Sequence, residues 1–248
     1  MREYRADLHI HTVLSACAEI EMIPPLIVEE ALAKGLDIIA VTDHNTTGNA
    51  LAVREAAAGT ALTVLVGMEL QTREEVDLLC IFDAEPALEA WQHAVDDAVL
   101  PLSNDVERFG PQFVVDAAGD FVAEESRLLQ APTTLGLEDA ARQIHALGGL
   151  VIPAHIDREH NGLIHMLGIW PSELDADAAE VSPNMRPSQA RQRFPSLPPG
   201  LPLVSSSDAH WLAWMGKTMT IFRIHGQPSV ASLGQALRSE NGQRAFVP

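Results

Sequence analysis

Short apolar runs recur along the chain and alternate with longer segments rich in alanine, leucine and charged residues. A short apolar run bounded by glycine, proline or aspartate predicts a β-strand, whereas the longer amphipathic segments predict helices. We expect strands at residues 4–11, 37–42, 62–66, 76–82, 150–154, 178–182, 202–206 and 218–224. We expect helices at residues 24–34, 46–58, 87–99, 137–147 and 230–237. Strands that alternate with helices are typical of right-handed βαβ units, so the pattern predicts an α/β fold.

The alternation is interrupted over residues 84–134. This segment contains the helix expected at 87–99, a turn with proline and asparagine, and a run at 113–122 that predicts a small hairpin with Gly119 in its turn. We interpret 84–134 as an insertion of a helix plus a hairpin on the rim of the fold, and as a candidate lid. An excursion of the chain that never contacts substrate would explain the pattern equally well.

The proline-rich segment 183–202 is expected to be a loop. It is not interpreted as a linker between domains, because residues with candidate chemistry occur on both sides of it. A chain of 248 residues can bury a large core as one α/β barrel or as two small domains. Because the candidate chemistry is spread over the whole chain, we expect a single domain over residues 1–248.

Metal-ligand residue types follow several of the predicted strands. Residues two positions apart on a strand point to the same face, so Asp7, His9 and His11 should project together. Further ligand types stand at the ends of other apolar runs, at Asp43, His44, Glu69, His155, Asp208 and His210. In an α/β barrel the ends of parallel strands meet at one rim, where chemistry takes place. The pattern therefore predicts a transition-metal site on that rim.

Composition narrows the classes of partner and the cellular compartment that we expect. The formal net charge of −18 argues against a nucleic-acid backbone or an anionic membrane as the main partner. The two cysteines do not form a disulfide framework, which favours a reducing cytoplasm. We see no apolar stretch of signal-peptide type at the N-terminus and no apolar run of about 18 residues. We therefore expect a soluble cytoplasmic protein.

The ordered set of motifs resembles the polymerase and histidinol phosphatase (PHP) superfamily of metal-dependent phosphoesterases. The matching motifs are Asp-Leu-His-Ile-His at 7–11, Ile-Ile-Ala-Val-Thr-Asp-His at 38–44, Gly-Met-Glu at 67–69, Pro-Ala-His at 153–155 and Ser-Asp-Ala-His at 207–210. The resemblance covers essentially the whole chain outside the insertion. It implies a distorted (β/α)7 TIM-like barrel with two or three divalent metal ions at the carboxyl ends of the strands.

The resemblance also implies a distribution of ligands among the ions. One ion would be held by His9, His11, Glu69 and Asp208. Glu69 would bridge to a second ion that it shares with residue 77 and His155, and His44 and His210 would belong to a third. Asp43 is interpreted as a carboxylate that orients an imidazole.

The chain departs from the commoner family pattern at two places. Asp77 stands where many members have histidine, and the Ser15-Ala16-Cys17 stretch stands where members have an aspartate or histidine. A carboxylate at 77 makes the site harder and favours Mn, Fe or Mg relative to Zn. Cys17 is a candidate Zn ligand, although a free cysteine is also a common small buried residue. The identity of the ions among Zn, Mn and Fe stays open.

The expected reaction is hydrolysis of a phosphate ester of a small phosphorylated metabolite, with a metal-bound hydroxide as the nucleophile. Phosphate also needs a cationic side chain, ideally a guanidinium. Arg158, three residues after His155, is the first candidate, and His160 and Arg186 follow.

Two alternatives remain at this stage. The first is an amidohydrolase-like enzyme that cleaves amides or lactones, but many such enzymes use a bridging carboxylated lysine. Only Lys34 and Lys217 occur here, and neither stands at a middle strand end. The second is a non-catalytic metal-binding or regulatory module, which the changes at 16, 17 and 77 make worth testing.

Overall fold

The computed structural model describes residues 1–83 and 85–248. Its strands are β1 (Arg2–Ile10), β2 (Ile38–Val41), β3 (Thr63–Gln71), β4 (Asp77–Phe82), β5 (Phe113–Val115), β6 (Phe121–Glu124), β7 (Leu150–Pro153), β8 (Ala179–Val181), β9 (Leu203–Ser205), β10 (Thr220–Ile224) and β11 (Arg244–Phe246). Its α-helices are α1 (Pro24–Ala33), α2 (Ala50–Ala56), α3 (Glu85–Asp96), α4 (Val106–Phe109), α5 (Leu137–Ala146), α6 (Leu163–Leu167), α7 (Pro187–Arg193) and α8 (Val230–Leu237). Two 3₁₀ helices are η1 (Leu212–Trp214) and η2 (Glu240–Gly242).

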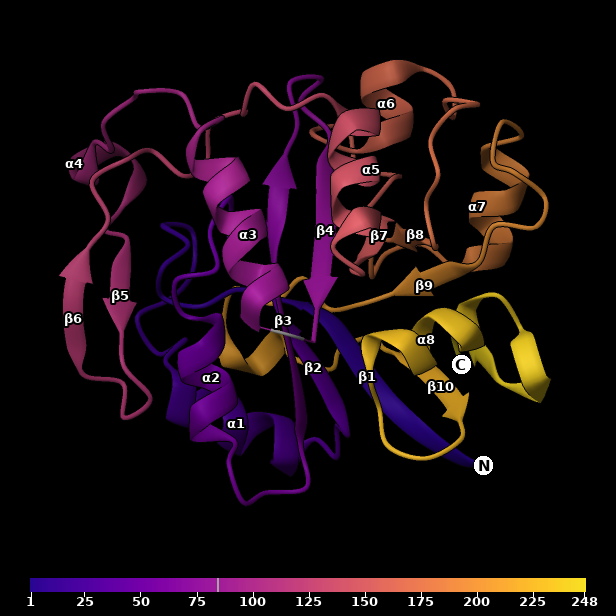
Figure 1. The fold of residues 1–248 in the computed structure, drawn as a ribbon, viewed down its shortest axis with the longest axis horizontal. Helices are drawn as coiled ribbons and strands as arrows, with labels where there is room; N and C mark the ends of the chain where they lie inside the picture. The colour runs from indigo at the N-terminus through magenta and orange to yellow at the C-terminus, as the bar shows by residue number, and fades with distance from the viewer. Residues whose placement is uncertain (84) are drawn as a thin grey trace.

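The main sheet has seven strands in the order β11-β10-β1-β2-β3-β4-β7, and it curls around a buried interior (Figure 1). Strands β1, β2 and β3 are parallel, as the βαβ pattern predicts. β8 and β9 form a separate parallel pair, and the bridge between Ile10 and Ala209 ties the segment after β9 to the end of β1. The predicted α/β class is thus confirmed.

A complete (β/α)7 barrel of parallel strands is not confirmed within the described residues. β4 pairs antiparallel with both β3 and β7, because β3 and β4 are joined by a short turn and not by a crossover helix. β10 also runs antiparallel to β1. The reversal of β4 places its first residue, Asp77, opposite Gln71 at the far end of β3. β4 therefore contributes to the site through its first residue, Asp77, whereas the parallel strands contribute through their carboxyl ends.

The proline-rich segment 183–202 is only partly a loop, and our expectation is corrected there. It contains α7, which begins at Pro187. Proline is favoured at the first helical position because its φ is already helical and its missing N–H has no helical partner there. The same preference starts α1 at Pro24-Pro25, as expected. No helix in the described part of the chain is long and apolar enough to cross a membrane.

The insertion contains α3, α4 and the β5–β6 hairpin; its predicted first residue, Ala84, lies outside the described residues. Gly119 sits in the hairpin turn with a φ of +85°, as expected. The hairpin packs beside the segment that follows β1, since Phe113 N–H donates to the carbonyl of Val13 over 3.2 Å. Asn49 also anchors it, because its Nδ2 donates to the carbonyl of Phe113 and its Oδ1 accepts from Val115 N–H.

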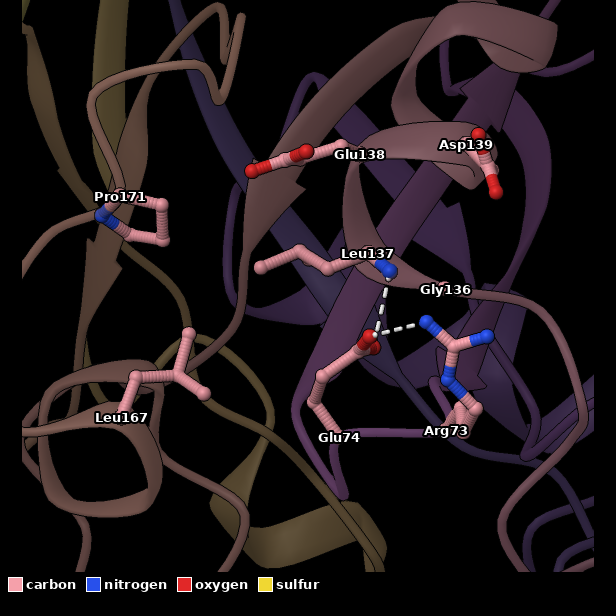
Figure 2. A pocket seen from close by; sticks show the side chains of 8 residues that line it. All are labelled: Arg73, Glu74, Gly136, Leu137, Glu138, Asp139, Leu167 and Pro171. Carbon is pink, nitrogen blue, oxygen red and sulfur yellow. Dashed lines mark hydrogen bonds and ion pairs between the residues drawn. The ribbon is translucent and has the colours of Figure 1, made fainter.

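The turn between β3 and β4 is attached to the start of α5. Glu74 Oε2 accepts a hydrogen bond of 2.9 Å from the backbone N–H of Leu137, the first residue of α5 (Figure 2). The residue before the helix, Gly136, has no side chain that could cap it. Glu74 therefore caps α5 from another part of the chain, and its negative charge lies at the positive end of the helix.

Replacing Glu74 with glutamine is expected to lower the free energy of unfolding by about 1 kcal/mol, because the charged cap on α5 is lost. Urea denaturation followed by circular dichroism measures the change. Glu75→Gln is the matched control, since Glu75 is exposed in the same turn. Equal stabilities of the two variants would contradict the capping role of Glu74.

Candidate metal centre

Six segments of the chain bring their polar residues to one place at the rim of the sheet. His9 and His11 come from the end of β1, and Glu69 comes from β3. The remaining members follow or begin other strands: His44 after β2, Asp77 at the start of β4, His155 after β7, and Asp208 and His210 after β9. Most of these side chains are buried, and His44 and His210 are partly buried.

Glu69 lies at the centre of the cluster. Its Oε1 is 3.3 Å from His9 Nε2 and 2.9 Å from His155 Nε2. Its Oε2 is 3.3 Å from His11 Nε2 and 3.0 Å from His44 Nδ1. One carboxylate thus reaches four imidazoles, which is the arrangement that a bridging ligand requires.

Asp208 is the second carboxylate of the cluster. Its Oδ1 is 3.3 Å from His9 Nε2 and 3.2 Å from His11 Nε2. Its Oδ2 accepts a hydrogen bond from the guanidinium of Arg158. The side-chain donors fall into three groups whose ligand atoms lie within 4.8 Å of one another: His9, His11 and Asp208; His9, Glu69 and His155; and His11, His44 and His210.

The electrostatics of the cluster match a site for cations. Burial alone would raise the pKa of Glu69, but the neighbouring His9 and His44 hold that pKa well below its usual value. For Asp208, burial likewise acts to raise the pKa, and His9 and His11 lower it well below the usual value. Both carboxylates are therefore charged inside a buried site, and buried charges require compensation.

The donor set fits divalent metal ions. One buried atom of the cluster, Asp208 Oδ1, faces His9 and His11 and has no hydrogen-bond partner in the described part of the chain. Unsatisfied buried polar atoms are costly, and they occur where a ligand or ion supplies the missing partner. Imidazole nitrogens and carboxylate oxygens are the ligands that Zn, Mn and Fe share.

Two non-glycine residues of the cluster have strained backbones. The φ angle is +25° at His155 and +51° at Asp208. Positive φ values are uncommon for side chains of this kind, and such strain concentrates at functional sites. In the turns after β7 and β9, this backbone conformation directs the side chains of His155 and Asp208 toward the cluster.

Cys17 and Asp77, the two departures from the family pattern, lie at opposite sides of the cluster. Cys17 Sγ is 3.4 Å from His44 Nε2. Cys17 is an exposed residue, and hydrogen bonds from His210 and His44 lower the pKa of its thiol to about 5. Asp77 Oδ2 is 3.6 Å from His155 Nε2, and burial together with the charge of Glu69 raises the pKa of Asp77 to about 6.

The predicted orienting carboxylate, Asp43, is linked to the imidazole of His11 through the hydroxyl of Ser15. It accepts hydrogen bonds from Thr12 N–H and from Ser15 Oγ, each over 2.7 Å. Ser15 Oγ is in turn 2.9 Å from His11 Nδ1. Asp43 therefore positions His11 through Ser15, and no hydrogen bond joins it to His44 among the described residues.

Glu180, on β8, is a supporting residue that the sequence did not reveal. Its Oε2 lies 3.0 Å from His9 Nδ1 and accepts a hydrogen bond of 3.0 Å from the backbone N–H of His155. A carboxylate that holds the distal nitrogen of a ligating histidine fixes its orientation. The only signal was an acidic residue within the apolar run 178–182, where a buried acid needs a partner.

Asp7 is buried on β1 but lies outside the three donor groups. Its Oδ1 accepts from Ser207 N–H over 2.9 Å, and its Oδ2 accepts from Gly216 N–H over 2.8 Å. Asp7 therefore holds the segment that carries Asp208.

A cavity of about 370 Å³ opens above the cluster. Besides the cluster, its lining includes the predicted phosphate-binding residues Arg158 and His160, together with Asn161. Arg186, the third candidate, lines a different cavity. None of the described residues of the insertion lines this cavity, so its role as a lid stays a prediction.

A sequence model of the PHP domain matches residues 7–161, more than half of the chain. The chain belongs to the PHP domain family. The match begins with the His9–His11 strand and extends through His155 and Arg158.

Known proteins with related sequences or folds span a range of activities. The fold resembles that of a lesion-specific endonuclease, Endonuclease Q from Pyrococcus furiosus, with a TM-score of 0.70 and 18% identity over 98% of this chain and 58% of the endonuclease. It also resembles a protein described as a metal-dependent phosphoesterase from Bifidobacterium adolescentis, with a TM-score of 0.56 and 21% identity over 83% of this chain and 87% of that one. An uncharacterized protein from Methanocaldococcus jannaschii is 31% identical over 78 residues, 28% of this chain and 46% of that protein. The chain thus spans about half the length of the archaeal relatives that it matches.

The expectation that nucleic acid is excluded as a partner is wrong. A similar fold, with a TM-score of 0.69 and 17% identity over 98% of this chain and 58% of the other, occurs in an Endonuclease Q complex with a 27-mer duplex whose abasic lesion lies at the active site. The error came from the net charge of −18, which describes the whole surface. The local field at a site with metal ions differs from the average over the molecule.

Proposed function

We propose that this protein is a metal-dependent phosphoesterase that hydrolyses a phosphate ester in the cavity above the cluster. The arrangement of Glu69 and Asp208 among His9, His11, His44 and His155 carries the proposal. Two ionised carboxylates are buried there with imidazoles on all sides, and the cavity opens directly above them. Buried carboxylates surrounded by imidazoles are suited to bind two or more divalent metal ions.

Each ion would be held by residues already close to one another. His9, His11, Glu69 and Asp208 would hold the first ion, and Glu69, Asp77 and His155 would hold the second. His11, His44, His210 and Cys17 stand around the third position. When bound, ions of this kind activate water and neutralise charge on phosphate oxygens.

Arg158 is proposed to bind a phosphate oxygen of the substrate. Its guanidinium contacts Asp208, and its side chain is 41% exposed in the cavity, so part of its fork is free for a ligand. A planar guanidinium suits phosphate because it can donate two parallel hydrogen bonds. His160 lines the same cavity and would donate to the ester or to its leaving group.

The cavity accommodates a substrate of modest size. A volume of about 370 Å³ suits a phosphate with a small organic group, such as a nucleotide or a sugar phosphate. We therefore propose a phosphorylated small molecule or the phosphate of a nucleotide unit as the group that enters.

Hydrolysis of p-nitrophenyl phosphate, bis(p-nitrophenyl) phosphate and a panel of nucleotide and sugar phosphates tests the proposal. Protein is stripped with a chelator and supplied with Mn²⁺, Fe²⁺ or Zn²⁺ in turn. We expect release of p-nitrophenolate from the bis ester, or of phosphate from the monoesters, only with added metal. Amide or lactone hydrolysis without cleavage of any phosphate ester would contradict the proposal and support an amidohydrolase-like enzyme.

The positions of the two lysines argue against the amidohydrolase-like alternative, because many such enzymes bridge their metal ions with a carboxylated lysine. Lys34 Nζ donates to the carbonyls of Ala213 and Met215 and pairs with Glu30 at 3.2 Å. Lys217 Nζ lies over the ring of Trp214. Neither lysine belongs to the three donor groups of the cluster, in which Glu69 would be the bridging ligand.

Cys17 is expected to ligate the third ion as a thiolate. A thiolate bound to Co²⁺ gives an intense charge-transfer absorption in the near ultraviolet, so Co²⁺-loaded protein should show this band and the Cys17→Ser variant should lose it. Cys80→Ser is the control, because Cys80 is buried on β4 among apolar residues. An unchanged band in the Cys17→Ser variant would exclude Cys17 as a ligand.

A further inference from the structure

Two exposed tryptophans follow the cluster directly in the sequence. Trp211 comes one residue after His210, and Trp214 ends η1. Each is 37% exposed, and their ring centroids are 4.1 Å apart. The other two tryptophans of the chain, Trp91 and Trp170, are buried at 0% and 7%. A pair of partly exposed aromatic rings, in the segment that follows the candidate metal centre, suits the binding of a flat ligand group.

Two cations without carboxylate partners extend this surface. Lys217 Nζ lies 4.4 Å from the centroid of the Trp214 ring. Lys217 also lines a cavity of about 440 Å³ together with Arg186 and the hydroxyl-bearing residues Ser188, Ser205 and Thr218. Among the ion pairs of the described residues, none includes Lys217 or Arg186. In a chain with 16 basic and 34 acidic residues, two cations without ion pairs that line one cavity favour a local site for anions.

The segment that contains Trp211, Trp214 and Lys217 is attached to β1 and to α1 by hydrogen bonds. The carboxylate of Asp7 accepts from Ser207 N–H through one oxygen and from Gly216 N–H through the other. It thus fixes the residues on either side of the Trp211–Trp214 pair. Lys34 Nζ, at the end of α1, also donates to the carbonyls of Ala213 and Met215. A ligand on this surface would therefore be held in a constant position relative to Asp208.

We propose that Trp211, Trp214, Lys217 and Arg186 form a binding surface for a single strand of nucleic acid. Bases would stack on the tryptophan rings, and backbone phosphates would contact Lys217 and Arg186. A single strand carries flat bases and anionic phosphates in alternation. The surface offers tryptophan rings for the bases and, over one of these rings, the ammonium group of Lys217 for a phosphate. Trp211 and Asp208 belong to one segment of the chain, so the inference rests on the proposed function and names its substrate class.

The test measures binding without turnover. Anisotropy of a fluorescently labelled twelve-residue oligodeoxythymidylate is titrated with the full chain in the presence of a chelator, so no hydrolysis contributes. We expect binding that weakens with salt, about 10-fold weaker affinity or more for Trp211→Ala/Trp214→Ala, and a shallower salt dependence for Arg186→Ala/Lys217→Ala. Trp211→Phe/Trp214→Phe should retain most of the affinity, because phenylalanine also stacks. Arg142→Ala, an exposed arginine on α5, is the matched charge control.

Absence of binding by the unmodified protein, or equal affinity of the Trp→Ala and Trp→Phe variants, would overturn the inference. Association with anionic phospholipid vesicles in place of the oligonucleotide would overturn it as well. A separate assay of p-nitrophenyl phosphate hydrolysis distinguishes failure of the proposed binding surface from failure of the proposed phosphoesterase function. Activity without oligonucleotide binding would leave the phosphoesterase proposal standing and reject this surface. Tryptophan-dependent binding without phosphoesterase activity would support the surface and reject the proposed function.

Discussion

Replacing Asp208 with asparagine is expected to lower phosphoesterase activity by about 1,000-fold or more. Asp208 places one carboxylate oxygen within 3.3 Å of both His9 and His11, and the other oxygen accepts from Arg158. The amide of asparagine carries no negative charge, so the ion that His9 and His11 would hold loses a charged ligand and should bind more weakly. Phosphate release from the best substrate of the panel and metal content by inductively coupled plasma mass spectrometry measure the two effects.

Asparagine is a suitable replacement because the backbone at Asp208 has a φ of +51°, which asparagine tolerates well. The variant should therefore keep its fold, and its melting temperature checks this. Asp120→Asn, on the exposed hairpin turn of the insertion, is the control for loss of one acidic group. Full activity of a folded Asp208→Asn variant would reject the role of this carboxylate.

Replacing Glu180 with glutamine is expected to lower metal affinity and activity by about 10- to 100-fold. Glu180 contacts no cavity surface, but its Oε2 holds His9 Nδ1 and the backbone N–H of His155 together. Glutamine keeps the size and removes the charge that orients the His9 ring. A titration with Mn²⁺ or Zn²⁺, followed by calorimetry, measures the affinity.

A positioning role for Glu180 predicts that saturating metal restores most of the activity of Glu180→Gln. Glu173→Gln, on an exposed turn, should behave like the unmodified protein. Metal affinity that does not change in Glu180→Gln would contradict the role. Loss of activity at full metal occupancy would show that Glu180 acts by another route.

The candidate cluster was predictable where ligands follow buried strands. His9 and His11 share a face by the two-residue period of β1, and Glu69, His155 and Asp208 each follow an apolar run. The parallel core β1-β2-β3 was predictable for the same reason, since continuous apolar runs are buried on both faces.

The direction of individual strands and the partners of residues far apart in the sequence were not predictable from the local pattern of apolar and polar residues. The antiparallel course of β4 depends on the length of the β3–β4 turn, and it alone brings Asp77 to the rim. Glu180 could not be assigned because its partners, His9 and His155, lie 171 and 25 residues away in the sequence. The exclusion of nucleic acid failed because a sum of charges contains no information about how charge is distributed around a site.

Dependence of activity on metal tests the central claim most directly. The purified protein is assayed with p-nitrophenyl phosphate, its bis ester and nucleotide phosphates as isolated, after chelation, and after addition of Mn²⁺, Fe²⁺ or Zn²⁺. The cluster around Glu69 predicts loss of phosphate release on chelation and its recovery with at least one of these ions, with two or more ions bound per chain. Phosphate release that persists after complete metal removal, or a protein that binds none of these ions, would contradict the account.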